Sequence, residues 1–240
     1  MEKTVLESSA KLIITDDIKY LDDYLPISDV IRSRATSITN GFDEEDFQGL
    51  PEPDPRRKFT VSYIGSLYGQ ETFDLLLQPV RIWRQAHPDE LLDVEFVYAG
   101  SQSYYFHRAG AFPFFLRDAG YVTHRQALLL RMDSDLQLFA QPRHFKPYFY
   151  SGKIFEMLRA GIPILAATRP DGTVTNLLLE TNAGFTAAQR PEQAAAILKI
   201  QFDKWRRGEH WEKPDMNLVQ RGISPTLGGY SRGNDRYPLS

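Results

Sequence analysis

YFYSGKIFEMLRAGIPILA, residues 148–166, combines a polar turn, a helix and a buried strand in one short stretch. Its apolar residues recur at the spacing of one helix face: Ile154, Phe155 and Leu158. Gly161 predicts the end of this helix, because glycine readily adopts the left-handed conformation that ends helices, and Pro163 follows it. The run 162–167 has no polar alternation, which is typical of a parallel strand that is covered on both faces.

The turn that opens the helix contains residue types that suit an anion. Ser151 and Gly152 precede the helix and Lys153 begins it, so free backbone N–H groups and an ammonium group would meet at one place. Glu156 lies one turn further along, where it could reach a hydroxyl group beside a bound diphosphate. An ordinary loop–helix–strand connection with solvated charges is the alternative interpretation of these residues.

Length and composition bound the class of protein. With 240 residues the chain can form one large domain or two small ones, and 42% hydrophobic and 25% charged residues are typical of a soluble globular protein. Cysteine is absent, which excludes disulfides and thiolate metal ligands. The five histidines do not cluster with carboxylates at metal-ligand spacing, so no metal is expected. We also expect no signal peptide and no transmembrane helix, because no apolar run approaches about 20 residues.

The charge is spread unevenly along the chain. The net charge is −3, and residues 1–58 contain 13 acidic and 8 basic residues, whereas residues 59–240 are slightly basic. Neither part has the strongly basic surface that nucleic-acid binding requires. A nucleic acid is therefore not an expected partner.

From Phe59 onwards, patterns of strand and helix alternate. The expected strands are 59–65, 94–100, 121–124, 136–140, 162–167 and 184–186. The expected helices are 70–86, 125–132, 172–180 and 191–205, with a partly helical aromatic stretch at 104–118. This alternation predicts right-handed βαβ crossovers and a doubly wound, Rossmann-like α/β fold with a mostly parallel sheet. Ligands of such sheets bind beyond the carboxyl ends of the strands, where Gly65, Gly100 and the loop 140–153 fall.

The residues before Phe59 and after the last helix have a different character. Short strands are expected at 11–15 and 36–39, with an acidic helical segment through Tyr24 between them. Residues 43–58 contain several Pro and Gly breakers and mixed charges, which favours a linker. Residues 208–240 are polar and Gly-rich, so we expect a C-terminal strap or a disordered tail.

Three landmarks occur in order along the chain: ITNGFD (38–43), YIGSLYG (63–69), and SGKIFEMLRAGIPILA (151–166) followed by ETNAGF (180–185). Together they resemble the C-terminal, donor-binding domain of a retaining GT-B glycosyltransferase close to family four (glycosyl transferases group one). The resemblance spans about residues 10–200 and implies four parts. Residues 1–42 would be the tail of the N-terminal acceptor domain and the crossover, 43–58 the linker, 59–207 the nucleotide-sugar-binding domain, and 208–240 the strap.

The resemblance implies transfer of a sugar, as in a hexosyltransferase of polysaccharide biosynthesis, from a UDP- or GDP-sugar to a glycan or lipid-linked acceptor. It implies no cofactor, no metal and a cytoplasmic location, and leaves open peripheral association with the inner face of the membrane through the acceptor half. The missing acceptor domain, in cis or in trans, is the implied partner, so the isolated chain should be inactive. Two alternatives remain, a GT-B type sugar-nucleotide epimerase and a non-catalytic nucleotide-binding or assembly subunit.

The family's motifs assign roles to individual residues. Glu156 corresponds to the second glutamate of the paired-glutamate motif, which accepts hydrogen bonds from the nucleotide ribose, and Lys153 lies at the diphosphate; these two are the catalytic candidates. Charge builds on the leaving diphosphate during transfer, so cations and N–H donors are needed there. The further candidates for donor binding are Gly65, Ser66, Gly100, Val122, Thr123, Arg143, Ser151, Gly152 and Ile154.

The sequence departs from the family pattern at two places. Tyr148 occupies the position of the first glutamate, which contacts the sugar in the family. The run 66–71 after Gly65 contains no cation, although family members usually place a Lys or Arg there. Lys153 or Arg143 would then have to substitute, or donor binding would be weak.

Overall fold

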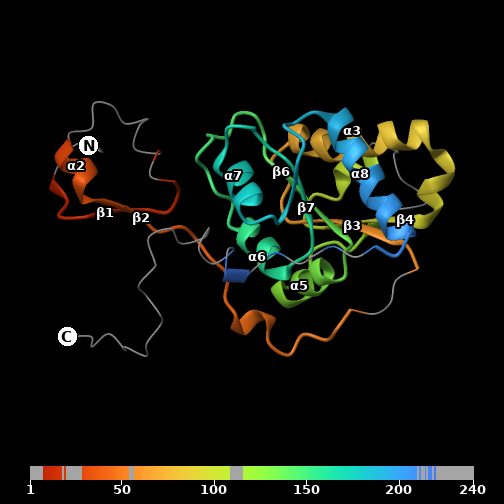
Figure 1. Cartoon of the computed structure of the whole chain (residues 1–240), viewed down its shortest axis with the longest axis horizontal. Helices are drawn as coiled ribbons and strands as arrows, with labels where there is room; N and C mark the ends of the chain where they lie inside the picture. The colour runs from red at the N-terminus through yellow and green to blue at the C-terminus, as the bar shows by residue number, and fades with distance from the viewer. Residues whose placement is uncertain are drawn as a thin grey trace.

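The computed structural model describes residues 8–17, 19, 29–53, 57–108, 116–209, 211, 214, 216, 217 and 219. Most of the expected helical segment through Tyr24 and most of the expected strap after Gly208 lie outside these residues. The larger part of the described chain is an α/β unit, and a small N-terminal unit lies to one side of it (Figure 1).

The large unit contains one six-stranded sheet with the order β5-β4-β3-β6-β7-β8. Its strands are β3 (Phe59–Ile64), β4 (Val94–Ala99), β5 (Leu116–Asp118), β6 (Leu136–Ala140), β7 (Ile164–Ala167) and β8 (Gly184–Thr186). Every pair of neighbouring strands in it is parallel. After β3 the chain adds strands on one side, and from β6 onwards it adds them on the other. This is the doubly wound, Rossmann-like fold that the alternation of elements predicts.

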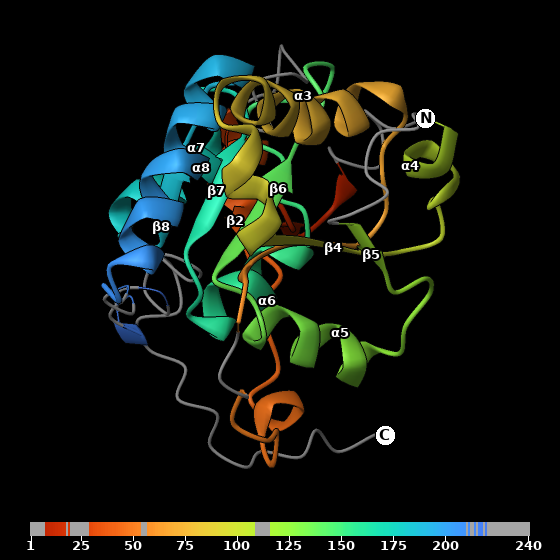
Figure 2. The same cartoon turned by 90° about the vertical axis from the view of Figure 1, so that its right-hand side faces the viewer.

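Helices cover both faces of this sheet (Figure 2). Helices α3 (Gln70–Ala86) and α8 (Pro191–Arg206) pack together on one face. Helices α5 (His124–Met132) and α6 (Lys153–Ala160) contact each other on the opposite face. The remaining helices are short: α4 (Tyr104–Arg108), α7 (Thr173–Glu180) and the 3-10 helix η3 (Pro88–Asp93).

Two apolar clusters form the core. Alternate residues of β3 belong to the cluster with α3 and α8: Phe59, Val61 and Tyr63. Phe139 of β6 belongs to the second cluster, with α6 and α7. Ile154, Phe155 and Leu158 are at most 1% exposed, so the predicted apolar face of α6 is the buried one. Each such side chain stabilises the fold by about 1.5–3 kcal/mol, which fixes α6 against the sheet.

Helix α6 ends as predicted. Gly161 has the left-handed φ of 70° at the C-cap of α6.

The prediction of a strand at 121–124 is wrong. The edge strand β5 is Leu116–Asp118 instead, and Tyr121 is 87% exposed. Thr123 caps α5 in a capping box with Gln126, so its backbone begins a helix rather than extending a strand.

The small N-terminal unit consists of β1 (Leu12–Ile14), α2 (Asp29–Arg34) and β2 (Ala35–Ser37), with the two strands parallel. It contacts the large unit at the start of the stretch 148–166. The Tyr150 N–H donates to the Asp16 carboxylate at 2.9 Å, and the Asp17 N–H donates to the Tyr148 carbonyl at 3.3 Å. The N-terminal unit therefore fixes the loop that leads into α6.

Part of the expected linker is packed against the large unit. The 3-10 helix η2 (Glu45–Phe47) follows Glu44, whose carboxylate accepts hydrogen bonds from the Arg159 guanidinium at 2.8 and 2.9 Å. The same guanidinium lies 4.7 Å from the centre of the Phe47 ring. Arg125 donates to the Gly49 carbonyl at 2.8 Å. Residues 44–49 are thus attached to both α5 and α6.

Candidate functional site

The candidate site lies at the carboxyl edge of the sheet, where the strand order changes direction between β3 and β6. Gly65 follows β3 and Gly100 follows β4. A Cβ atom at Gly100 would overlap the Tyr98 hydroxyl and lie 2.6 Å from the Gly65 carbonyl oxygen. Gly65 has a φ of +129°, which side chains rarely allow. Both positions therefore require glycine, and the two strands end close together.

Lys153, the first residue of α6, extends its side chain under this edge. Its Nζ donates to the Tyr63 hydroxyl at 2.9 Å and lies 4.6 Å from the centre of the Tyr63 ring and 5.3 Å from that of Tyr68. A Cβ atom at Gly65 would lie 3.6 Å from this Nζ. Burial, followed by the positive charge of Arg131, lowers the pKa of Lys153 to about 7. The aromatic faces attract the cation without neutralising it.

Glu156 lies one helical turn after Lys153 and has contacts to both of its carboxylate oxygens. Its Oε1 is 3.0 Å from His124 Nε2, and its Oε2 is 3.7 Å from Arg131 Nε. The side chain is 28% exposed. His124 in turn places Nδ1 3.7 Å from the Asp46 carboxylate, so a residue of η2 is linked to Glu156 through one imidazole. An ionised carboxylate accepts about four hydrogen bonds, which leaves acceptor capacity for a ligand hydroxyl.

Arg131, in the last turn of α5, is buried behind Glu156 and Lys153. The residue is 3% exposed, and its guanidinium donates weakly to Gln137 at 3.4 Å and to the Ile64 carbonyl at 3.3 Å. Its Nε is buried and has no hydrogen-bond partner in the part of the chain that the structure describes. Burial lowers the pKa of Arg131 to about 10, and the charge of Glu156 opposes this effect. Two cationic side chains are therefore buried here, and only Arg131 of the two lies next to the Glu156 carboxylate among the described contacts, which favours the approach of an anion.

Sequence reasoning missed both Arg131 and His124. The run ALLLRM gave Arg131 no polar neighbour, and a charged residue in such a run was the available signal that it is buried and paired. His124 was not considered because the segment 121–124 was predicted to be a strand, whereas His124 is the first residue of α5.

The contacts that the structure gives for Arg143 are with Glu71, and not with Lys153 or Glu156. Its side chain is 73% exposed, and its backbone N–H donates to the Glu71 carboxylate at 3.0 Å. His144 Nδ1 lies 3.7 Å from the same carboxylate. The basic loop that precedes α6 is therefore attached to the first turn of α3 through Glu71.

The other candidates from the sequence shape the backbone around the site. Ser151 is buried, and its carbonyl accepts the Ile154 N–H at 3.0 Å, so this N–H is engaged inside the turn. Gly152 is exposed at the N-cap of α6. The Ser66 carbonyl accepts a hydrogen bond from the Tyr63 hydroxyl at 2.7 Å. Val122 precedes Thr123, whose N–H donates to the Gln126 side chain at 2.9 Å.

Tyr148, at the position of the family's first glutamate, is 6% exposed. The loop around it is held by a buried amide, Gln141, which accepts from the Thr168 hydroxyl at 2.8 Å and donates to the Phe149 carbonyl at 3.2 Å. Gln189 donates to the Gln141 carbonyl at 2.7 Å and has a positive φ of 57°. These contacts fix the loop in one conformation, with the tyrosine directed into the protein.

Among the residues that the structure describes, no group of His, Asp and Glu side chains could hold a metal ion. Within the same residues, no helix is both long and apolar enough to cross a lipid bilayer.

Comparisons with known proteins give matches among solved structures only. No family model matches the sequence, and no curated protein matches it. One matching structure is S. aureus TarM, a mutant in complex with fondaparinux, alpha-GlcNAc-glycerol and UDP, with 13% identity and a TM-score of 0.62. A second is WaaG, a glycosyltransferase involved in lipopolysaccharide biosynthesis, with 12% identity and a TM-score of 0.61. A third is an E. coli protein described as trehalose-6-phosphate bound with UDP-2-fluoro glucose, with 11% identity and a TM-score of 0.63.

These matches cover 96%, 91% and 94% of this chain, but only 43%, 58% and 59% of the matched chains. The chain thus spans about half of each matched protein. At such low identities the comparisons establish a fold and leave the reaction open. Over the part that it spans, this chain has the fold of a GT-B glycosyltransferase domain.

Proposed function

We propose that the chain is the donor-binding part of a retaining glycosyltransferase and binds a nucleoside-diphosphate sugar at the carboxyl edge of its sheet. The observation that carries the proposal is the placement of Lys153 and Glu156. They lie one turn apart at the start of α6, next to Gly65 and at the point where the strand order reverses. Two of the matched structures contain UDP or a UDP-sugar, which supports this ligand class.

The proposed roles follow from charge and geometry. Breaking the bond between the sugar and the diphosphate builds negative charge on the leaving group, so a cation held at that place lowers the barrier. Protonated Lys153 supplies this cation, and the buried charge of Arg131 adds to the field. Glu156 accepts hydrogen bonds from the ribose hydroxyls, while His124 and Arg131 hold its carboxylate in place. The acceptor would come from a second domain, in cis or in trans, and the proposed reaction therefore needs that domain.

Thermal unfolding in the presence of UDP or GDP tests the proposal. A ligand that binds only the folded state raises the unfolding temperature, and at about 100 times Kd it contributes about 2.7 kcal/mol. We expect a shift with one of these nucleotides, which Lys153→Ala and Glu156→Ala each reduce strongly. Lys199→Ala is the matched control, because Lys199 is a lysine of α8 that pairs with Asp203 and Glu90 away from the site. No shift with either nucleotide at millimolar concentration would contradict the proposal.

A second candidate function is nucleotide binding without sugar transfer. Tyr148 favours it, because a buried tyrosine replaces the glutamate that contacts the sugar in the family that the sequence resembles. The two functions differ in one measurement. A binding subunit gives the same unfolding shift with UDP as with UDP-glucose, whereas a donor site for glucose gives an additional shift with the sugar nucleotide.

A further inference from the structure

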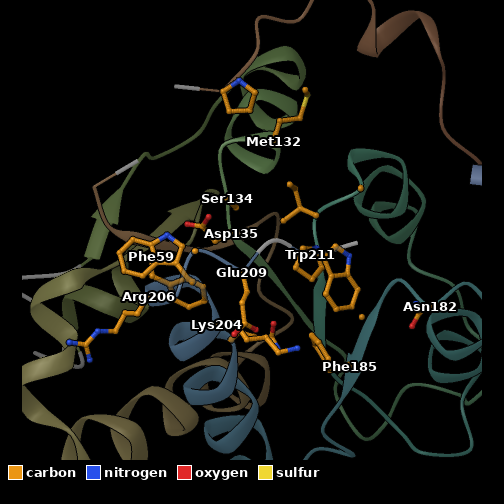
Figure 3. Close-up of a pocket in the computed structure, with 18 of the residues that line it drawn as sticks. Phe59, Met132, Ser134, Asp135, Asn182, Phe185, Lys204, Arg206, Glu209 and Trp211 are labelled. Carbon is orange, nitrogen blue, oxygen red and sulfur yellow. The ribbon is translucent and has the colours of Figure 1, made fainter. Parts of the chain in front are cut away.

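A large cavity lies at the opposite edge of the sheet from Lys153 and Glu156. Its volume is about 1280 Å³, and it is bounded by the amino ends of strands and by the end of α8 (Figure 3). Phe59 begins β3, Asp135 precedes β6, and Phe185 lies in β8. Because parallel strands all begin at one edge, this cavity is separated from the candidate nucleotide site by the length of the strands. Nothing in the proposed function uses it.

Aromatic side chains line much of this cavity. Trp205, Trp211 and Phe185 are partly buried, so each combines packing against the protein with an accessible surface. The Phe185 and Trp211 rings are 5.2 Å apart, and the Phe59 and Trp205 rings are 6.0 Å apart. Figure 3 shows Phe59 and Trp211 on opposite sides of the cavity. Phe59 itself is 1% exposed, so Trp205 beside it supplies the accessible aromatic surface on that side. A flat ligand could therefore contact Trp205 on one wall and Trp211 on the other.

An amide side chain without a partner among the described residues also lines this space. Gln201 lines the cavity, is 8% exposed, and its side chain forms no hydrogen bond with the described residues. Because Gln201 lines the cavity, its amide is placed to pair with a group that is bound there. A ligand hydroxyl group could therefore pair with the Gln201 amide in place of water.

The charges of the described residues around the cavity balance. Among these residues, three acidic and three basic ones line it: Glu52, Arg57, Asp135, Lys204, Arg206 and Glu209. A site for a phosphate or a nucleotide would have an excess of cations, as the surroundings of Lys153 do. The balance favours a ligand with no net charge.

We propose that this cavity binds a neutral oligosaccharide. A pyranose ring has an apolar C–H face, which packs on the negative face of an aromatic ring, and hydroxyl groups at its edge, which pair with amides. The cavity exceeds the roughly 300–1,000 Å³ of common small-molecule sites, which leaves room for several sugar units. Binding of an oligosaccharide in this cavity does not depend on the proposed function. If the cavity holds a glycan during sugar transfer at the carboxyl edge, that role does rest on the proposed function.

Intrinsic tryptophan fluorescence provides the test, with maltohexaose, cellohexaose and chitohexaose as probes. The chain has three tryptophans. Trp83 is 2% exposed in the core, so a change in emission reports on Trp205 and Trp211. We expect a saturable change with at least one hexasaccharide below about 10 mM, and at least about tenfold weaker binding in Gln201→Leu and Phe185→Ala. Ile200→Ala is the matched control, because Ile200 adjoins Gln201 on α8, is 52% exposed and does not line the cavity.

The outcomes separate this proposal from the proposed function. No saturable change with any of the three probes overturns it, and so does equal binding by Gln201→Leu and wild type. Gln201→Leu exchanges an unpaired amide for an alkyl group, so the variant should fold even where Phe185→Ala does not, and its unfolding temperature checks this. Lys153→Ala should bind the oligosaccharide normally, and Gln201→Leu should keep the unfolding shift with UDP. If only the UDP shift is observed, the oligosaccharide site alone is refuted.

Discussion

Lys153 is held where its positive charge is costly for the fold. Its ordinary pKa is 10.5, and burial together with Arg131 lowers this pKa to about 7. The unfolded chain therefore binds more protons than the folded chain between these two pH values. Consequently the free energy of unfolding rises as the pH is raised from about 7 toward 10.5, and the full penalty is present below pH 7.

Lys153→Met should therefore stabilise the protein while it weakens nucleotide binding. At pH 6 we expect the variant to exceed wild type in free energy of unfolding by at least about 1 kcal/mol, because the buried charge is removed. The difference should shrink between pH 7 and 10. Urea denaturation across this range measures it, with Lys199→Met as the control. A variant that is no more stable than wild type at pH 6 would contradict this prediction, because it would show that other interactions offset the cost of burying the Lys153 charge.

His124 is expected to act by positioning Glu156. With the Nε2 contact of 3.0 Å removed in His124→Ala, the carboxylate loses one of its two neighbours. If the less well oriented carboxylate loses about 1 kcal/mol of binding free energy, UDP binding weakens roughly five- to tenfold. Titration calorimetry should find this loss for UDP but not for 2′,3′-dideoxy-UDP, which lacks the ribose hydroxyls.

His87→Ala is the control for this measurement, because His87 lies next to Glu90 at the end of α3. Equal weakening of both nucleotides by His124→Ala would indicate a general effect on the fold rather than a role in orienting Glu156.

At this residue scale, the sequence predicted Lys153 and Glu156 as site residues because both lie in one continuous turn and helix. It could not identify Arg131 or His124. These residues meet Glu156 only because α5 packs on α6, and such contacts between distant segments leave no local pattern.

At the scale of elements, regular periodic patterns were predictable, and short edge elements were not. The helix 70–86 and the strand 136–140 have the predicted bounds, because long amphipathic and fully apolar runs specify their own structure. The edge strand β5 has only three residues, with none buried, so no apolar pattern distinguishes it. Tyr121 and Val122 have strand propensity, but the capping interaction of Thr123 with Gln126 takes precedence.

The joint between β3 and β4 gives a prediction at this scale. Gly100→Ala should destabilise the fold by about 1–3 kcal/mol, because the new Cβ atom would displace Tyr98 or the Gly65 carbonyl. The displacement should also weaken UDP binding at this edge. Chemical denaturation measures the first effect and calorimetry the second.

Gly208→Ala provides the comparison for Gly100→Ala. Gly208 has a φ of +70° and open space around its Cβ position, so the variant should lose only about 1 kcal/mol. Similar losses in both variants would mean that the close approach of β3 and β4 is not what makes Gly100 necessary.

At the scale of the whole molecule, two edges of one sheet carry different chemistry. The carboxyl edge holds two buried cations and a carboxylate, whereas the amino edge holds an aromatic cavity with balanced charge. The small N-terminal unit contacts the loop that precedes Lys153, through Asp16 and Asp17. A second domain that joined this unit could therefore influence the proposed nucleotide site through one short loop.

The central claim is that a nucleoside diphosphate binds at the carboxyl edge, and a crystal structure of the chain with UDP tests it most directly. We predict that the diphosphate lies within hydrogen-bonding distance of Lys153 Nζ and that the ribose hydroxyls contact the Glu156 carboxylate. UDP bound elsewhere, for example in the cavity beside Trp211, would contradict the claim, as would a structure at millimolar UDP with none bound at this edge.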